Sequence, residues 1–143
     1  MSPHLPQSKT SPIGPGRRVE PEWLDVLPHD HPEARRSRRD IRLLNRLMGN
    51  FRAMRRLLDG SVHSSDRILE IGAGEGALAR FLEPLRVDAL DRCPPPPDWP
   101  VGQAWHRTCL LGFEGFSHYT VLIGNLILHH FPDAPLMEWA GRL

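Results

Sequence analysis

A short apolar segment followed by three closely spaced glycines is the feature that most constrains how this chain folds. Residues 68–71 are apolar except for Glu70, a composition typical of a buried parallel strand. Gly72, Gly74 and Gly76 follow, and apolar residues then recur at helical spacing. Glycines let the backbone approach a ligand closely, and the first turn of a helix offers free N–H groups. Strand, glycine turn and helix therefore predict the start of a nucleotide-binding βαβ unit.

Two classes of ligand are bound by turns of this kind. Dinucleotide binders use G-x-G-x-x-G/A, which Gly72, Gly74 and Ala77 match loosely. The pattern acid-x-G-x-G-x-G of S-adenosylmethionine (SAM) binders is matched in full by Glu70, Gly72, Gly74 and Gly76. A carboxylate at Glu70 would repel a pyrophosphate and attract the ammonium and sulfonium groups of SAM. The acidic residue therefore favours SAM over a dinucleotide.

Length and composition indicate one domain and do not point to a nucleic acid or a membrane as its partner. The chain has 143 residues, 40% of them hydrophobic, and a net charge of +1, so no strong overall field favours nucleic acid or a membrane. No apolar run is long enough to span a bilayer. Cys93 and Cys109 make neither a disulfide framework nor a metal-binding spacing, which fits a reducing, cytoplasmic location.

The two segments before the glycine turn are expected to differ: the first is disordered and the second is helical. Residues 1–32 contain seven prolines and are predicted to be a disordered leader. Residues 33–60 are predicted to form one cap helix that ends at Gly60, with Gly49 as a possible kink. Six arginines crowd its first half, and they form either a solvated basic face or a contact to an acidic ligand group. Residues 61–143 make up the remaining domain.

A second strand and an unusual connection follow the glycine turn. The helix that begins at Glu75 is expected to close at Pro84, and residues 87–91 are predicted to be the second strand. Asp91 ends that strand, where ligands bind in open α/β sheets, and its carboxylate can accept hydrogen bonds from ribose hydroxyls. The alternative is an ordinary aspartate in a turn. Four prolines at residues 94–97 exclude a helix and predict an extended strap.

The last third of the chain supplies two more strands. Residues 103–107 are a candidate third strand, and the apolar run in residues 119–128 predicts a central buried strand. Pro132 and Asp133 are expected to open a final helix. His129 and His130 are adjacent, so they cannot both face one metal ion, and no metal site is expected.

With these motifs in place, residues 67–133 resemble the first half of a class I SAM-dependent methyltransferase of the small-molecule type. The resemblance implies an α/β, Rossmann-like parallel sheet of strands one to four in the order 3-2-1-4, under an N-terminal helical cap. Three features depart from the family: the proline strap replaces a helix, Thr120 replaces a usual aspartate, and no acid follows the third strand at Thr108 or Cys109.

The resemblance also implies a set of cofactor-binding positions. Glu70 would hold the methionine amino end of SAM, Asp91 the ribose, and Asn125 would lie beside the methyl group. The backbone of Cys109 or Leu110 would contact the adenine. The full set is Glu70, Gly72, Ala73, Gly74, Gly76, Asp91, Arg92, Cys109, Leu110 and Asn125. His129 or His130 is a weaker candidate for a base toward substrate, the alternative being packing and hydrogen bonding in the loop.

The expected function is methyl transfer from SAM to a small-molecule nucleophile by in-line displacement. Two alternatives stay open: a catalytically inactive SAM-binding or structural fragment, and an NAD-dependent oxidoreductase. The family fold has seven strands, so the sheet is expected to be incomplete and the chain a fragment. An apolar fourth strand would then lie at the edge and promote self-association.

Overall fold

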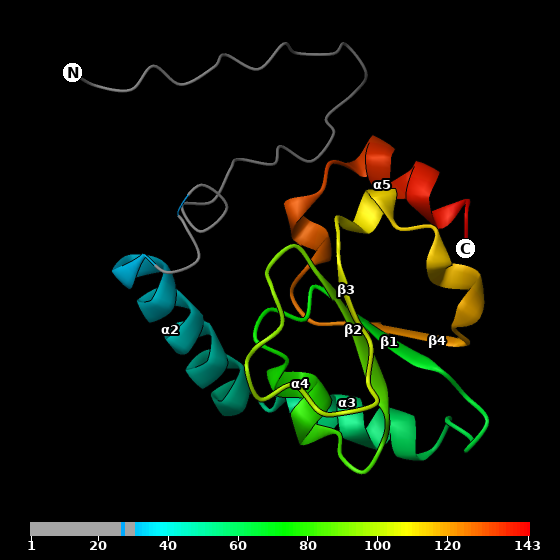
Figure 1. Cartoon of the computed structure of the whole chain (residues 1–143), viewed down its shortest axis with the longest axis horizontal. Coiled ribbons are helices and arrows are strands. Elements are labelled where there is room, and N and C mark those ends of the chain that lie inside the picture. Colours follow the sequence, from blue (N-terminus) through cyan, green and yellow to red (C-terminus); the bar gives the residue numbers. More distant parts are fainter. Residues whose placement is uncertain (1–26, 28–30) are drawn as a thin grey trace.

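The computed structural model describes residue 27 and residues 31–143, and it has an α/β architecture (Figure 1). The expected disordered leader lies almost entirely outside the described residues, and Pro32 already belongs to the first described helix. The elements are the helices α2 (Pro32–Met48), α3 (Asn50–Asp59), α4 (Ala77–Phe81) and α5 (Asp133–Ala140), the strands β1 (Ile68–Ile71), β2 (Val87–Asp91), β3 (Trp105–Arg107) and β4 (Val121–Gly124), and the 3₁₀ turns η1 (Leu110–Gly112), η2 (Gly115–His118) and η3 (Leu128–His130).

The four strands form one parallel sheet in the order β3-β2-β1-β4, which confirms the predicted Rossmann-like order. The register pairs Ile71 with Leu90 on one side and with Gly124 on the other. The carboxyl ends of β1, β2 and β4 therefore lie at the same edge of the sheet. The glycine turn directly follows β1, Asp91 is the last residue of β2, and Asn125 directly follows β4.

Strand β1 is buried along its whole length because other elements cover both faces of the sheet. Ile68 and Val87 pack with α3 and α4 on one face, in a cluster that includes Leu58, Leu78 and Leu82. Alternate residues of the strands face the other way. They pack there with α5 and the turns η1 and η2, in a cluster made of Leu69, Ile71, Leu90, Leu110, Phe116 and Trp139. Figure 1 shows these two layers on either side of the sheet.

The single cap helix expected over residues 33–60 is two helices, so that prediction was wrong. Gly49 separates α2 from α3 in a left-handed conformation, with φ of 70°. A right-handed helix cannot continue through such a residue, and glycine adopts it without a steric penalty. Gly60 caps the end of α3 as expected. The packing partners come from α3, through Phe51, Met54 and the buried Leu58.

The fourth strand is shorter and less central than expected. It spans only Val121–Gly124, lies at the edge of the sheet, and buries Ile123 alone, so the expectation of a central buried strand was wrong. The chain leaves the strand after Gly124 because Leu126 takes a left-handed φ of 57° and the turn η3 follows. The edge position agrees with the predicted strand order, and self-association through it stays a prediction.

The helix after the glycine turn is also shorter than expected. It begins at Ala77, not Glu75, and ends at Phe81, three residues before Pro84. The connection from β2 to β3 contains no helix, as the four prolines predicted. Trp99 fixes its position, since its indole Nε1 donates to the Gln103 carbonyl at 2.9 Å and its ring packs edge-on against Trp105.

Alanine at two glycines of the turn separates backbone strain from packing. Gly74 and Gly76 both have left-handed φ values, so either substitution costs about 1–2 kcal/mol in strain. A Cβ on Gly76 would lie 2.4 Å from the Trp99 ring, whereas a Cβ on Gly74 meets nothing within 4 Å. We expect Gly76→Ala to lower the free energy of unfolding by a further 1–3 kcal/mol or so relative to Gly74→Ala. If urea titrations show equal losses of unfolding free energy for the two variants, the Trp99 side chain moves aside without a measurable cost.

Candidate functional site

The candidate site lies at the carboxyl edge of the sheet, around the glycine turn. The amides of Gly72 and Ala73 both donate to the Leu90 carbonyl, at 2.8 and 3.3 Å, which ties the start of the turn to β2. Asp91 follows Leu90 directly and ends that strand. The structure therefore brings together two motifs that the sequence separates by a helix and a strand.

Asp91 holds the glycine turn with its own side chain. Its Oδ2 accepts a hydrogen bond from the Gly74 amide and its Oδ1 accepts one from the Cys93 amide, each at 2.8 Å. The side chain is half-buried, so part of it faces solvent at the edge of the sheet. Each carboxylate oxygen has a further lone pair for a ligand hydroxyl. This geometry is compatible with the expected ribose contact. The bond from Cys93 also fits the alternative of an aspartate in a turn, and the bond from Gly74 is a role that the sequence did not indicate.

The three motif glycines have different surroundings. A Cβ on Gly72 would lie 2.5 Å from Ile127, and one on Gly76 would lie 2.4 Å from Trp99. Both glycines therefore make room for side chains of this same chain. Only above Gly74 is the space open to 4 Å. Close approach of a ligand to the turn is thus confined to Gly74, although the sequence pattern treats the three glycines alike.

Glu70 lies beneath α4 with only 3% of its surface exposed. Its Oε2 accepts a hydrogen bond from the Ala79 amide at 3.1 Å. Burial raises the pKa of Glu70 to about 8, and the nearby Asp91 charge adds to the rise, while the Ala79 hydrogen bond and Arg80 oppose it. The carboxyl is therefore mostly protonated at neutral pH. Any preference of the turn for a cation through Glu70 requires this group to ionise.

Asn125 connects the site to the N-terminal helices. Its Oδ1 accepts a hydrogen bond from the Asn50 Nδ2 at 3.4 Å, and Asn50 is the first residue of α3. The next residue, Leu126, is held in the left-handed region, where a residue other than glycine costs about 1–3 kcal/mol and often marks a functional loop. No local pattern in the sequence indicates Asn50, because the contact spans 75 positions.

The remaining predicted residues lie around the end of β3. The Thr108 amide donates to the Asp91 carbonyl at 3.0 Å, which places this end beside Asp91. Cys109 and Arg92 are exposed, while Leu110 is buried in the core with only 4% of its surface exposed. The carbonyls of Cys109 and Leu110 accept hydrogen bonds from Gly112 and Phe113 within the turn η1.

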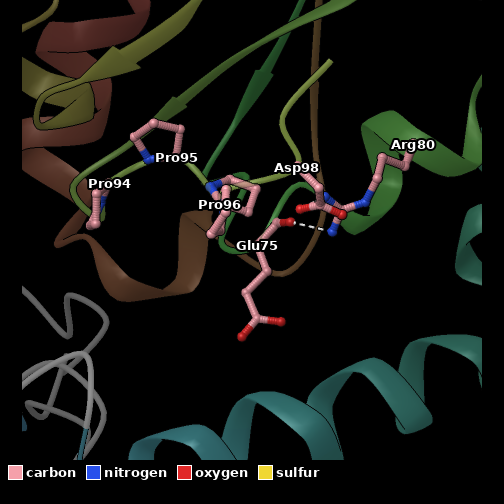
Figure 2. A pocket seen from close by; sticks show the side chains of 7 residues that line it. Glu75, Arg80, Pro94, Pro95, Pro96 and Asp98 are labelled. Carbon is pink, nitrogen blue, oxygen red and sulfur yellow. Dashed lines mark hydrogen bonds and ion pairs between the residues drawn. The ribbon is translucent and has the colours of Figure 1, made fainter.

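A cavity of about 450 Å³ lies between the glycine turn and the proline strap (Figure 2). Arg80 is one of the residues that line it, with Nη2 donating to the Glu75 carbonyl at 2.7 Å and Nη1 donating to Asp98 Oδ1 at 3.1 Å. Figure 2 shows the Glu75 side chain extending away from the prolines. The sequence predicted an extended strap but not that it forms a wall here. The lining residues are Glu75, Arg80, Pro94, Pro95, Pro96, Pro97 and Asp98.

His129 and His130 form the turn η3 after β4. Their rings stack at 4.0 Å between centroids with a tilt of 35°. Across residues 31–143 the structure brings no three histidine, cysteine or acidic side chains together in a way that could hold a metal ion.

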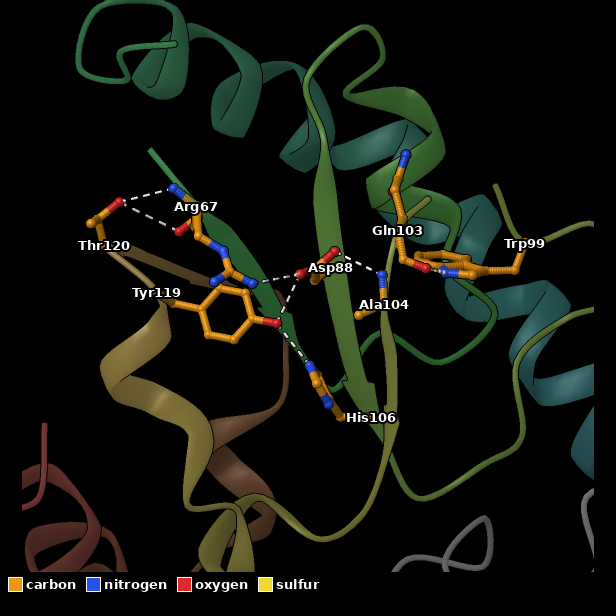
Figure 3. Close-up of polar contacts among 8 residues, drawn as sticks. All are labelled: Arg67, Asp88, Trp99, Gln103, Ala104, His106, Tyr119 and Thr120. Atoms are coloured by element: carbon orange, nitrogen blue, oxygen red, sulfur yellow. Dashed lines mark hydrogen bonds and ion pairs between the residues drawn. The ribbon is translucent and has the colours of Figure 1, made fainter. Parts of the chain in front are cut away.

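A second polar cluster lies near the amino ends of the strands, away from the glycine turn (Figure 3). The Tyr119 hydroxyl donates to Asp88 Oδ2 at 2.8 Å and lies 2.7 Å from His106 Nε2. Because the single hydroxyl proton is given to Asp88, His106 Nε2 must be the donor in the second bond. Burial, followed by the hydrogen bond to Asp88, raises the pKa of Tyr119. Asp88 Oδ1 also accepts from the Ala104 amide, so the cluster braces β2 against β3 and the start of β4.

Comparison of the chain with protein-family models, with curated proteins and with solved structures gives no match.

Replacing the buried acid should change the pH dependence of stability. In the folded state the pKa of Glu70 is raised from 4.5 to about 8, so its stabilising contribution is complete below pH 4.5 and is lost as the pH rises toward 8. Glu70→Gln cannot ionise and retains an acceptor for the Ala79 amide. We expect the variant to gain up to about 1.4 kcal/mol per pH unit over the parent across this window.

Urea unfolding at a series of pH values measures this difference directly. Glu83→Gln is the matched control, because Glu83 is exposed and lies in the same part of the chain. A difference between parent and Glu70→Gln that does not change with pH would mean that Glu70 is ionised in the folded protein.

Proposed function

We propose that this chain binds SAM at the carboxyl edge of the sheet and belongs to a methyltransferase acting on a small-molecule nucleophile. The observation that carries the proposal is the hydrogen bond from the Gly74 amide to the Asp91 carboxylate. It places a strand-end acid beside the one motif glycine that is open to a ligand. An acid at this position suits the two hydroxyls of a ribose, and a Cβ-free turn suits the close approach of the rest of the ligand.

The residues fit such a ligand by shape and by donor type. The open space at Gly74 leaves its backbone accessible, and Asp91 retains acceptor capacity beyond its two backbone partners. Asn125 adds an amide at the end of β4, on the other side of the turn. Bound SAM supplies a methyl group on a positively charged sulfur. The chain would orient that group and exclude water, which are the main requirements of methyl transfer.

The acceptor is proposed only as a small-molecule nucleophile. Attack in line with the carbon–sulfur bond transfers the methyl group, and the proton of the nucleophile leaves to solvent or to a nearby base. His129 and His130 follow Asn125 closely, and a neutral imidazole has one ring nitrogen that can accept that proton. Cys93 and Cys109 are not joined in a disulfide, which agrees with a reducing, cytoplasmic setting.

One observation keeps a nicotinamide dinucleotide as a second candidate. The sequence argument against it relied on a charged Glu70, and the pKa of this group is raised to about 8. A protonated Glu70 does not repel a pyrophosphate. A SAM-binding chain without catalytic activity is the third possibility, and it differs from the first only by turnover.

Removal of the Asp91 carboxylate should weaken SAM binding. Loss of hydrogen bonds to a charged group costs roughly 1–3 kcal/mol, so Asp91→Ala should raise the dissociation constant about 5–150-fold. Asp91→Asn retains one acceptor and should lose less. Asp59→Ala, at an exposed position of α3, is the control and should bind as the parent does.

Titration calorimetry with SAM, its demethylated product and NAD measures these affinities, and unfolding curves show whether each variant is folded. Unchanged affinity in folded Asp91→Ala would remove Asp91 from the site. Binding of NAD but not SAM would favour the oxidoreductase. Binding of SAM without methyl transfer to any nucleophile in a panel of small molecules would favour the inactive SAM binder.

The charge of Glu70 should make ligand choice depend on pH. As Glu70 ionises near pH 8, we expect SAM affinity to rise and NAD affinity to fall in the parent. The amino group of SAM titrates near pH 8 as well, so the parent is compared with Glu70→Gln at each pH. A ratio of SAM affinities, parent over variant, that stays constant from pH 6 to pH 9 would contradict a role for this charge.

A further inference from the structure

Helix α2 has several large apolar side chains that are exposed in the described chain. Ile41, Leu44 and Met48 are spaced by three and four residues, so they lie on the same side of the helix. Their exposed fractions are 39%, 49% and 61%, and Leu43 is 56% exposed. Large apolar side chains grouped on one exposed helix face mark an interaction surface more often than isolated ones do.

The opposite side of α2 is basic. Helix α2 carries six arginines against Glu33 and Asp40. With 3.6 residues per turn, five of the six fall within an arc of about 100° that faces away from Ile41 and Leu44. The side chains of Arg35 and Arg39, both in this arc, are exposed. By position the arc contains Arg35, Arg38, Arg39, Arg42 and Arg46.

Helix α2 also stands apart from the sheet. It meets α3 at Gly49, whose φ of 70° breaks the helix and whose Cβ position has no atom within 4 Å. Figure 1 shows α2 projecting beyond the layers made by the sheet, α3 and α5. In the described chain, Ile41, Leu44 and Met48 on one side of the helix and Arg35 and Arg39 on the other are exposed.

We propose that α2 lies on the surface of an anionic lipid bilayer. A helix with a strongly basic side and an exposed apolar side binds in the interfacial plane, with apolar side chains in the acyl boundary and arginines near the lipid phosphates. None of the helices between Pro32 and Leu143 is long and apolar enough to cross a membrane. The helix therefore lies along the surface and does not span it.

Lipid explains both sides of the helix, whereas a nucleic acid explains only one. Phosphates of a nucleic acid would engage the arginines, but they offer nothing to Ile41, Leu44 and Met48. The net charge of +1 for the whole chain does not oppose the inference, because basic residues act on a membrane within about 8 Å at physiological salt. A bilayer bound by α2 would lie near the candidate site. Helix α2 ends at Met48, and Asn50, two residues later, donates a hydrogen bond to Asn125 of that site.

Sedimentation with lipid vesicles tests the proposal on the full chain. Vesicles of equal parts phosphatidylcholine and phosphatidylglycerol should bind the parent, and phosphatidylcholine alone should not. Arg35→Gln with Arg39→Gln should weaken binding about thirtyfold, since each basic residue contributes about 1 kcal/mol. Leu44→Gln with Met48→Gln should weaken it at least about tenfold.

Substitutions in α3 provide matched controls. Arg52→Gln with Arg56→Gln removes the same charge, and Leu57→Gln removes an apolar side chain that is 67% exposed. These variants should retain vesicle binding within about threefold, because they leave α2 intact. Circular dichroism confirms that every variant is folded.

Three results would overturn the proposal: equal binding to both vesicle types, loss of binding in the α3 controls as large as in the α2 variants, or no effect of the Leu44 and Met48 substitutions. If duplex DNA binds the parent and depends on Arg35 and Arg39 but not on Leu44, the partner is a nucleic acid and the lipid proposal is wrong. Because none of these measurements involves SAM, the result is independent of the proposed function.

Discussion

The hydrogen bond between the Gly74 amide and the Asp91 carboxylate joins the two halves of the candidate site. Parallel pairing brings β1 and β2 to a common edge, but pairing alone does not fix the conformation of the loop that leaves β1. Asp91 fixes it by accepting hydrogen bonds from the Gly74 amide and from the amide of Cys93, two residues further along the sequence. A ligand at this edge would meet a turn that is already positioned, which lowers the ordering cost of binding.

Burial of Glu70 is the main electrostatic cost near that turn. A carboxyl with 3% exposure is destabilised in its charged form, and one hydrogen bond from Ala79 does not offset the loss of water. The group is therefore stable mainly when protonated. A cationic ligand would change that balance, because a positive charge nearby favours ionisation. Glu70 is thus better suited to respond to a bound ligand than to attract one from solution.

The sequence predicted the features that depend on local pattern. The apolar run at 68–71, the glycines and the prolines at 94–97 were sufficient for β1 and for a connection without a helix, whereas the strand order was predicted from the family resemblance. Contacts between distant segments could not be predicted, such as Ile127 over Gly72 or Asn50 with Asn125. The extent of β4 was overestimated because an apolar run shows which residues avoid water but not where a left-handed residue such as Leu126 ends the strand.

The break at Gly49 shows how one residue relates the surface helix to the site. A Cβ there would meet no neighbour, so glycine is required by the left-handed φ and not by close packing. If the helix continued through this residue, the direction of α2 would follow that of α3, which packs against the sheet through Leu58. The turn instead sends α2 away from the sheet and starts α3 at Asn50, next to Asn125. Asn50 therefore connects the helix break at Gly49 to the end of β4.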